Sequence, residues 1–297
     1  MSNTTVQYYV VDVFTREKYK GNPLAVVCLD LGLEPAIYQK IAKEFGYSET
    51  SFVYYSSGQK ALKVRSFTPA GIEVNGAGHN LLGAVCLALE KEWDIFSQQK
   101  EERFVMMKDE VMPLSVSYLS DKTPFVGMLQ RPATLVNTIP VEEVAPAIGL
   151  SPESLLLKGW APTVVSTEVT HLMVPVKDKA SLHHAMGQKT LLNKLSQEYD
   201  FEGCYCFTLT DSDPVYIAES RFFNPGIGIE EDPATGSAAG PLAGFLHSKR
   251  YIQQNVNYSV LQGVKMGQPS TLQFSVTDEG IWVKGSSVIV MEGTLYL

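Results

Sequence analysis

The chain has 297 residues, more than one hydrophobic core usually holds, so two domains, or one unusually large one, are expected. Hydrophobic residues make up 45% of the chain and charged residues 19%, a globular composition that leaves no room for a long disordered tail. The net charge of −8 and the lack of a basic run argue against a nucleic-acid partner, because a phosphate backbone requires a concentrated Lys/Arg surface.

The N-terminus, MSNTTVQYYV, has no basic segment followed by an apolar one, and no stretch reaches the roughly 20 apolar residues that span a bilayer. We therefore expect a cytoplasmic protein with no membrane contact. The cysteines are few and scattered, which favours free thiols in a reducing compartment. Cys204 and Cys206 share one face of the strand-like run GCYCFTLT, but two ligands do not make a zinc site, so no metal is expected.

The first sixty residues alternate between strand and helix patterns. Strands are predicted at QYYVVDVFT (7–15), NPLAVVCL (22–29) and SFVYYSS (51–57). Before the third strand, PAIYQKIAKEF (35–45) is predicted as a helix that Gly46 closes. Glu49 lies between this helix and the strand TSFVYY, at a junction where functional groups are often displayed. A solvated loop glutamate is the alternative interpretation.

Residues 64–89 and 220–246 repeat one pattern of strand, glycine-containing turn and helix. An Arg-x-Phe-x-Pro motif recurs at a spacing of 156 residues, as Arg65, Phe67 and Pro69 and again as Arg221, Phe223 and Pro225. A small-Gly-polar turn recurs at a spacing of 158, as Ala77, Gly78 and His79 and again as Thr235, Gly236 and Ser237. The sequence therefore predicts a duplication.

The helices that follow the two turns, roughly His79–Glu92 and Ser237–Ser248, are apolar almost all round. A helix that is apolar on every side must be buried on every side, and wrapping a curved sheet around it is the economical solution. We expect an α+β fold of two pseudo-symmetric domains, each a sheet or barrel around a central helix. The predicted domains are residues 1–125, onto which strand 286–297 packs back, and residues 126–285.

Both small-Gly-polar turns open a helix and leave backbone N–H groups without intrahelical partners. Such helix starts attract anions through these N–H groups and the helix dipole. Gly78 and Gly236 are therefore predicted at the N-termini of two buried helices that point at one cleft, where they hold a small carboxylic acid. Ordinary helix capping is the alternative interpretation.

Two residues near these helix starts carry titratable groups. His79 lies where the helix dipole disfavours the protonated form, which leaves a neutral imidazole able to donate or accept a hydrogen bond. Asp232 precedes Pro233, which biases Asp232 to an extended conformation, although a simple turn residue is the alternative. The other histidines lack the spacing of a helical metal pair and are expected on the surface or in the core: His171, His183, His184 and His247.

Four segments in order, together with the C-terminal VIVMEGTLYL, resemble the signature segments of the PhzF-like (phenazine biosynthesis) family: GNPLAVV (21–27), SETSFV (48–53), SFTPAGIEVNGAGHN (66–80) and GIGIEEDPATGSAAG (226–240). The resemblance implies a fold like that of diaminopimelate epimerase, and a homodimer. It implies Glu49 as the proton-transferring acid/base, with His79 and Asp232 as its partners. The implied contacts to the substrate are Gly78, Asn80, Gly236 and Ser237.

Diaminopimelate epimerases use one cysteine from each half as paired bases, but the matching positions here are Ala77 and Thr235, which cannot serve as such bases. A single carboxylate that removes a proton at one carbon and returns it at another gives isomerisation. We therefore expect an isomerase of a small, cyclic or unsaturated carboxylic acid. No cofactor is expected, because GxGxxG after a strand, GxxxxGK[ST] and HExxH are all missing.

An epimerase, a racemase or a dehydratase on the same scaffold is an alternative, and so is a catalytically silent binding protein. The pairs Asn75-Gly76 and Asn80-Leu81 beside His79 depart from the family pattern. The surroundings of His79 are therefore more polar than is usual in the family, and phenazine biosynthesis does not follow from the resemblance.

Overall fold

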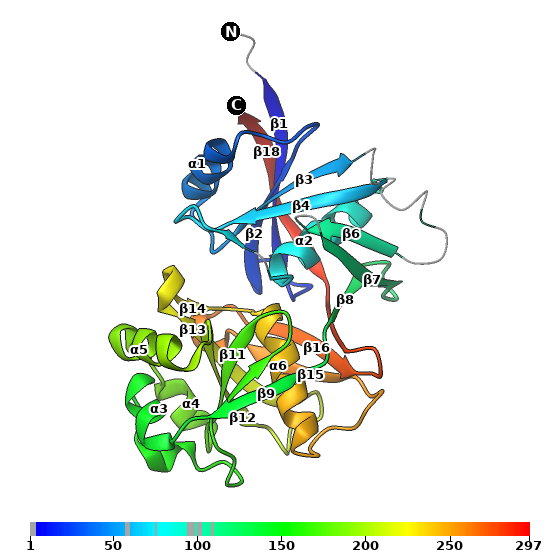
Figure 1. Ribbon diagram of the computed structural model, residues 1–297. Coiled ribbons are helices and arrows are strands. Elements are labelled where there is room, and N and C mark those ends of the chain that lie inside the picture. The colour runs from blue at the N-terminus through cyan, green and yellow to red at the C-terminus, as the bar shows by residue number, and fades with distance from the viewer. Residues whose placement is uncertain (1–3, 57–59, 75, 94–98, 100–102, 108–109) are drawn as a thin grey trace. The chain divides into compact units, whose positions relative to one another are not determined.

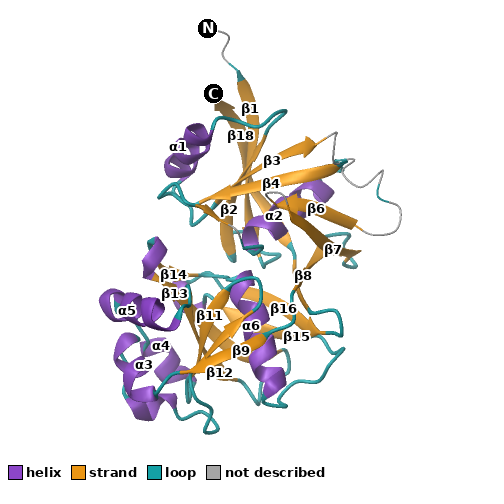
Figure 2. Cartoon of the chain, in the orientation of Figure 1, coloured by secondary structure: helices purple, strands orange, loops and turns teal. Residues whose placement is uncertain are grey.

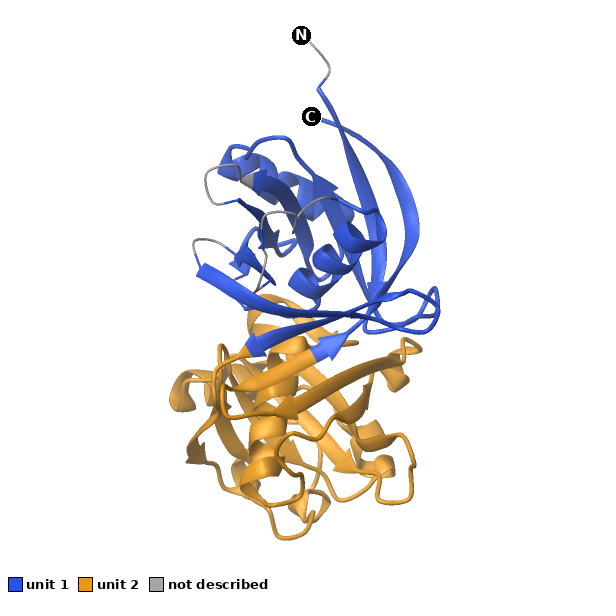
Figure 3. Cartoon of the chain, turned by 90° about the vertical axis from the view of Figure 1, so that its right-hand side faces the viewer, with its two compact units in different colours: residues 1–129, 284–297 blue, residues 130–283 orange. Residues whose placement is uncertain are grey.

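The structure is a computed structural model that describes residues 4–56, 60–74, 76–93, 99, 103–107 and 110–297. The chain divides into two compact units, Met1–Leu129 with Lys284–Leu297 and Gln130–Val283 (Figure 3). The sequence prediction for this division was 1–125 with 286–297, and 126–285. None of the helices in the described ranges is long and apolar enough to cross a membrane.

In its described residues, the first unit contains two helices and a set of strands drawn from both ends of the chain (Figure 1). The helices are α1 (Pro35–Phe45) and α2 (His79–Glu90). The strands are β1 (Thr5–Val13), β2 (Asn22–Cys28), β3 (Thr50–Ser56), β4 (Ala61–Phe67), β5 (Glu73–Val74), β6 (Arg103–Met107), β7 (Glu110–Tyr118), β8 (Pro124–Gln130) and β18 (Ser287–Tyr296). Helix α1 begins and ends where the sequence predicted, and Gly46 closes it with a φ of 70°.

The second unit adds more helices to a similar set of strands. Its α-helices are α3 (Val141–Ala147), α4 (Lys179–His184), α5 (Lys189–Tyr199) and α6 (Gly236–Ser248), and its 3-10 turns are Pro152–Leu155, Pro225–Ile227 and Val264–Met266. The strands are β9 (Thr134–Thr138), β10 (Thr163–Ser166), β11 (Thr170–Pro175), β12 (Gly203–Leu209), β13 (Tyr216–Asn224), β14 (Ile229–Asp232), β15 (Tyr258–Gln262), β16 (Ser270–Val276) and β17 (Ile281–Gly285).

Strand pairing repeats between the two units. In the first unit the order is β18-β1-β2-β3-β4-β6-β7, with parallel pairs β2/β3 and β4/β6 and antiparallel pairs elsewhere. In the second unit the order is β9-β10-β11-β12-β13-β15-β16, with parallel pairs β11/β12 and β13/β15 in the same places. The topology therefore repeats the duplication that the sequence motifs indicate. The C-terminal strand β18 takes the place in the first unit that β9 takes in the second.

A nearly all-buried helix lies at the centre of each unit (Figure 2). Helix α2 packs against β1, β2, β3 and β18, and α6 packs against β10, β11 and β16. Helix α2 approaches the sheet closely at Gly83, where an added Cβ atom would lie 2.6 Å from Val13 Cγ2 and 2.8 Å from Leu24 Cδ2. The prediction of a sheet around one central helix in each half is confirmed.

The arginine of the repeated Arg-x-Phe-x-Pro motif forms a matching ion pair in each unit. Arg65 donates from Nε and a terminal nitrogen to the two carboxylate oxygens of Glu73, at 2.8 and 2.7 Å. Arg221 makes the matching two-pronged pair with Glu231 at the same two distances. Since Glu73 and Glu231 lie on β5 and β14, each pair ties the short strand that precedes the central helix to the longer strand beside it.

Leu87→Ala, in the fully buried centre of α2, is expected to lower the free energy of unfolding by about 2 to 5 kcal/mol, because it leaves a cavity inside the sheet. Leu191→Ala on α5, where the side chain is 42% exposed, is the matched control and should cost under about 1 kcal/mol. Urea unfolding followed by circular dichroism measures both. Equal losses for the two variants would contradict the buried role of α2.

Candidate active site

The central helices begin without a side-chain cap at the preceding residue, which is Gly78 for α2 and Thr235 for α6. The sequence placed Gly78 and Gly236 at the starts of two buried helices, and each lies there in its own unit. The four N–H groups at the start of a helix have no intrahelical acceptor, so these starts depend on other polar groups.

In α2, the side chain of Asn80 folds back over the turn. Its Oδ1 accepts the N–H groups of Gly78 and Leu81, both at 2.8 Å, and its Nδ2 donates to the carbonyl of Gly76 at 3.2 Å. The sequence assigned Gly78 and Asn80 to substrate contacts, but here the Gly78 N–H and the Asn80 amide bond to each other. With respect to the residues that the structure describes, this arrangement leaves the N–H groups of His79 and Asn80 for a ligand at the helix start.

The start of α6 has an equivalent arrangement from different residues. Gln262 Oε1 accepts the N–H of Thr235 at 3.2 Å, and the carbonyl of Thr235 accepts the N–H groups of Ala238 and Ala239. The N–H groups that remain for a ligand belong to Gly236 and Ser237. In both units, therefore, the first two residues of the central helix present their N–H groups, which is the geometry that suits an anion.

In the first unit, the side chains of Asn22 and Ser48 form a short polar row that ends at His79. Ser48 Oγ lies 3.4 Å from His79 Nε2 and 3.4 Å from Asn22 Oδ1. Glu49 follows Ser48 directly, is half-buried, and precedes β3 as predicted. Burial lowers the pKa of His79 to about 3, so its imidazole is neutral and available as a hydrogen-bonding partner.

Asp232 is the buried last residue of β14 in the second unit. Its Oδ2 accepts a hydrogen bond from Thr235 Oγ1 at 2.5 Å. The hydroxyl of Thr235, the residue before α6, therefore holds the carboxylate of Asp232 near the helix start.

His171 on β11 is a residue whose position the sequence did not reveal. Its Nε2 lies 3.3 Å from Oγ of Ser237, the second residue of α6, and burial lowers the pKa of His171 to about 3. The sequence analysis predicted a surface or core histidine at this position. The available signal was a polar residue inside the apolar run THLMVP, but only the pairing of β11 beneath α6 brings it to the helix start.

A family model described as phenazine biosynthesis-like protein (PhzC-PhzF) matches residues 11–293, nearly the whole chain. The chain belongs to the phenazine biosynthesis-like family. This match confirms the family membership that the four sequence segments indicated.

Among curated relatives, the trans-2,3-dihydro-3-hydroxyanthranilate isomerase of Pseudomonas aeruginosa is 30% identical over 298 residues, covering 98% of this chain and 99% of the relative. A crystal structure of a PhzF-family protein from Bacillus anthracis has a TM-score of 0.86 at 24% identity, covering 99% of this chain and 100% of the other. A probable proline racemase from Agrobacterium radiobacter has a TM-score of 0.66 at 10% identity, covering 98% and 93%. The epimerase-like fold is confirmed, and the chain is a PhzF-like isomerase.

The PhzF-like chain carries no cysteine at either helix start. Burial raises the pKa of Cys28 and Cys86 to about 12, and the contact with Cys206 raises the pKa of Cys204. Cys204 and Cys206 lie side by side with their sulfurs 3.8 Å apart, and no group of three metal-ligating side chains exists among the residues that the structure describes. Of the two departures from the family pattern, Asn80-Leu81 lies in the first turn of α2, whereas Asn75 lies outside the described residues.

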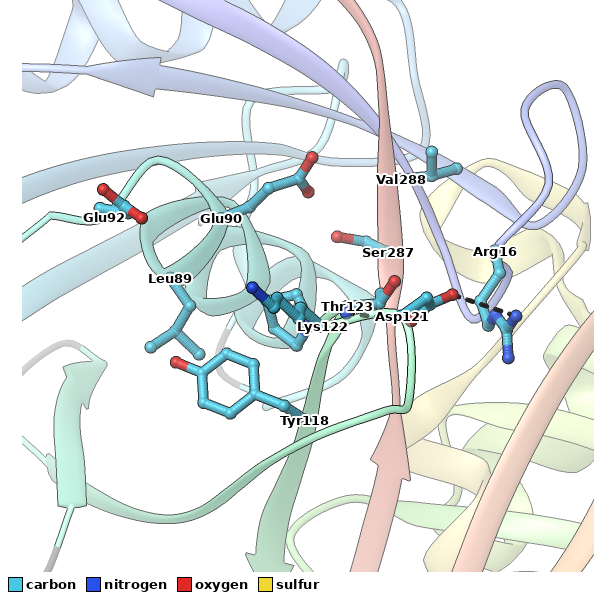
Figure 4. A pocket seen from close by; sticks show the side chains of 11 residues that line it. Arg16, Leu89, Glu90, Glu92, Tyr118, Asp121, Lys122, Thr123, Ser287 and Val288 are labelled. Atoms are coloured by element: carbon cyan, nitrogen blue, oxygen red, sulfur yellow. Dashed lines mark hydrogen bonds and ion pairs between the residues drawn. The ribbon is translucent and has the colours of Figure 1, made fainter.

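A pocket of about 590 Å³ lies in the first unit of this family member at the C-terminal end of α2 (Figure 4). Glu90, Tyr118 and Ser287 line it, and Arg16 and Asp121 at its edge form an ion pair of 3.2 Å. Since His79 begins α2 and Glu90 ends it, this pocket is separate from the helix start, and no predicted site residue lines it.

Acid should destabilise this protein through His79 and His171. Both stay neutral in the folded state down to a pKa of about 3, whereas in the unfolded chain they protonate below their ordinary pKa of 6.5. The unfolded state then binds more protons, so the free energy of unfolding falls as the pH drops from 6.5 toward 3, by up to about 1.4 kcal/mol per pH unit for each histidine.

His79→Asn and His171→Asn should each reduce this slope, measured by urea unfolding at a series of pH values. His247→Asn, at an exposed position of α6, is the control and should keep the wild-type slope. An unchanged slope in both buried-site variants would contradict the neutral state assigned to these histidines.

Proposed function

We propose that this isomerase transfers a proton by general acid–base catalysis, without a cofactor, on a small cyclic or unsaturated carboxylic acid. The observation that carries the proposal is the matched pair of central helix starts. Each offers the N–H groups of its first two residues, His79 and Asn80 in one unit and Gly236 and Ser237 in the other. Two adjacent N–H groups at the positive end of a helix dipole bind and orient a carboxylate, which is the recognition that this proposal requires.

Glu49 is proposed as the proton carrier. Its carboxylate takes a proton from one ring or chain carbon, and the electrons of the broken C–H bond form a new C=C bond. The existing C=C bond is lost, because its π electrons form the new C–H bond at its far carbon with the proton that Glu49 returns. Atoms and charge balance without an external oxidant, reductant or leaving group, which fits an isomerisation catalysed by one carboxyl group.

Two further residues support this assignment of roles. The neutral imidazole of His79 can donate or accept a hydrogen bond as charge develops on the substrate. In the second unit, Asp232 offers a carboxylate that the Thr235 hydroxyl holds in place. Catalysis by paired thiols is disfavoured, because Ala77 and Thr235 occupy the two turn positions and the Thr235 hydroxyl already donates to Asp232.

The first candidate substrate is trans-2,3-dihydro-3-hydroxyanthranilate, on which the Pseudomonas aeruginosa relative acts according to its name. It is a cyclic, unsaturated acid, and its carboxylate is the kind of group that the helix starts favour. A panel of other small cyclic carboxylic acids, each incubated with the protein in heavy water, extends the search, because deuterium incorporation at carbon reports proton transfer that a binding protein does not perform.

Glu49→Gln is expected to reduce turnover and deuterium incorporation by about 100- to 10,000-fold, because the amide cannot cycle a proton. Folding should be retained within roughly 0.5 kcal/mol. Glu44→Gln, an exposed glutamate on α1, is the matched control and should keep the wild-type rate. Deuterium exchange at the wild-type rate in Glu49→Gln would transfer the acid/base role to His79 or Asp232.

Exhaustive dialysis against EDTA should leave the rate within about twofold of the untreated protein, because the chain lacks metal-site and nucleotide-binding motifs. Assays of the dialysed protein with and without added Mg²⁺, Mn²⁺ or Zn²⁺ measure this. A loss of activity that one of these ions restores would contradict the proposal of a cofactor-independent reaction.

A further inference from the structure

Gln262, the last residue of β15, lies at the centre of a fully buried hydrogen-bond network beneath the start of α6. Its Nε2 donates to the carbonyl of Asp232 at 2.8 Å and to Thr235 Oγ1 at 3.1 Å. Its Oε1 accepts the N–H of Thr235 at 3.2 Å and the hydroxyl of Tyr205 at 3.0 Å. One amide thereby contacts both ends of the turn between Asp232 and Thr235.

The chemistry of these partners fixes which way the amide of Gln262 points. A backbone N–H can only donate, so the group facing Thr235 N must be the carbonyl oxygen of the side chain. A backbone carbonyl can only accept, so the group facing the Asp232 carbonyl must be the NH₂. The reversed amide would leave both contacts repulsive inside a buried site.

This orientation in turn fixes the direction of the Thr235 hydroxyl. The oxygen of Thr235 receives a hydrogen bond from Gln262 Nε2, so its single proton is left to donate to Asp232 Oδ2, 2.5 Å away. On the other side of the network, Ser220 Oγ donates to Tyr205 OH at 2.9 Å, and Tyr205 donates to Gln262 Oε1. Each donor therefore polarises the next one toward the carboxylate of Asp232.

We propose that Gln262 is a positioning residue that, through Thr235, holds Asp232 as an oriented hydrogen-bond acceptor for the reaction. This inference rests on the proposed function, which gives Asp232 its place in catalysis. Gln262 itself does not touch the substrate. It is separated from Asp232 by thirty residues of chain, including the whole of α6, so the role arises from the pairing of β15 with β13, where Gln262 lies opposite Ser220.

Two substitutions at this position distinguish an effect of the hydrogen bonds on catalysis from an effect of side-chain packing. Gln262→Met keeps the length of the side chain but removes all four hydrogen bonds, and should lower kcat by about ten- to a hundredfold with a smaller change in KM. Gln262→Glu should recover part of kcat when the introduced carboxyl is protonated, because its O–H can donate as Nε2 does. When ionised, it instead draws the Thr235 proton away from Asp232.

The decisive measurement is the ratio of variant kcat to wild-type kcat across a series of pH values, with trans-2,3-dihydro-3-hydroxyanthranilate or whichever panel acid the wild type converts. For Gln262→Glu this ratio should rise as the pH falls, and for Gln262→Met it should be flat. Tyr216→Phe is the control for loss of a tyrosine hydrogen bond in the same unit, because Tyr216 OH bonds Thr271, outside this network. It should keep the wild-type kcat, whereas Tyr205→Phe should lower it.

A wild-type kcat in Gln262→Met, or a flat ratio in Gln262→Glu, would overturn the inference while leaving the proposed function intact. If the wild type converts no acid in the panel, the proposed function fails, and crystal structures of the two variants then decide the positioning role. A Thr235 hydroxyl that still bonds Asp232 Oδ2 in Gln262→Met would overturn it. If Gln262→Met does not fold, the pH ratio and the structure of Gln262→Glu carry the test.

Discussion

The burial of a helix that is apolar on all sides is the constraint on which the rest of this structure depends. Helix α2 hides ten of its twelve residues, so a sheet must cover it on several faces, and α6 imposes the same requirement on the second unit. Removing such helices from water contributes much of the driving force for folding, whereas their N-terminal N–H groups still need polar partners. The site therefore forms where a buried helix begins.

Different side chains meet that need in the two units. At α2, the amide of Asn80 accepts two N–H groups from within the helix itself, and at α6 the amide of Gln262 reaches the turn from a neighbouring strand. Both solutions leave the first two N–H groups of the helix for a ligand. A neutral histidine lies beside a serine at each start, His79 with Ser48 and His171 with Ser237.

The duplicated plan has diverged in its acidic groups. The structural pairs Arg65–Glu73 and Arg221–Glu231 are matched in distance and geometry, because both stabilise the same strand junction. The carboxylates proposed for catalysis are not matched, since Glu49 precedes β3 in the first unit and Asp232 ends β14 in the second. Such asymmetry suits a reaction in which one group moves the proton and another stays an acceptor, unlike a reaction with two equivalent bases.

Local features were determined by the sequence: the ends of α1, the starts of α2 and α6, and the repeat itself, because capping glycines, apolar periodicity and motif spacing act over a few residues. Only the tertiary structure decided that Gln262 reaches Asp232 and that His171 reaches Ser237. These contacts depend on strand pairing and on the direction of a side chain within a packed turn. No local pattern encodes them, because each side chain is polar, solitary in its segment, and satisfied only by groups that the folded sheet brings to it.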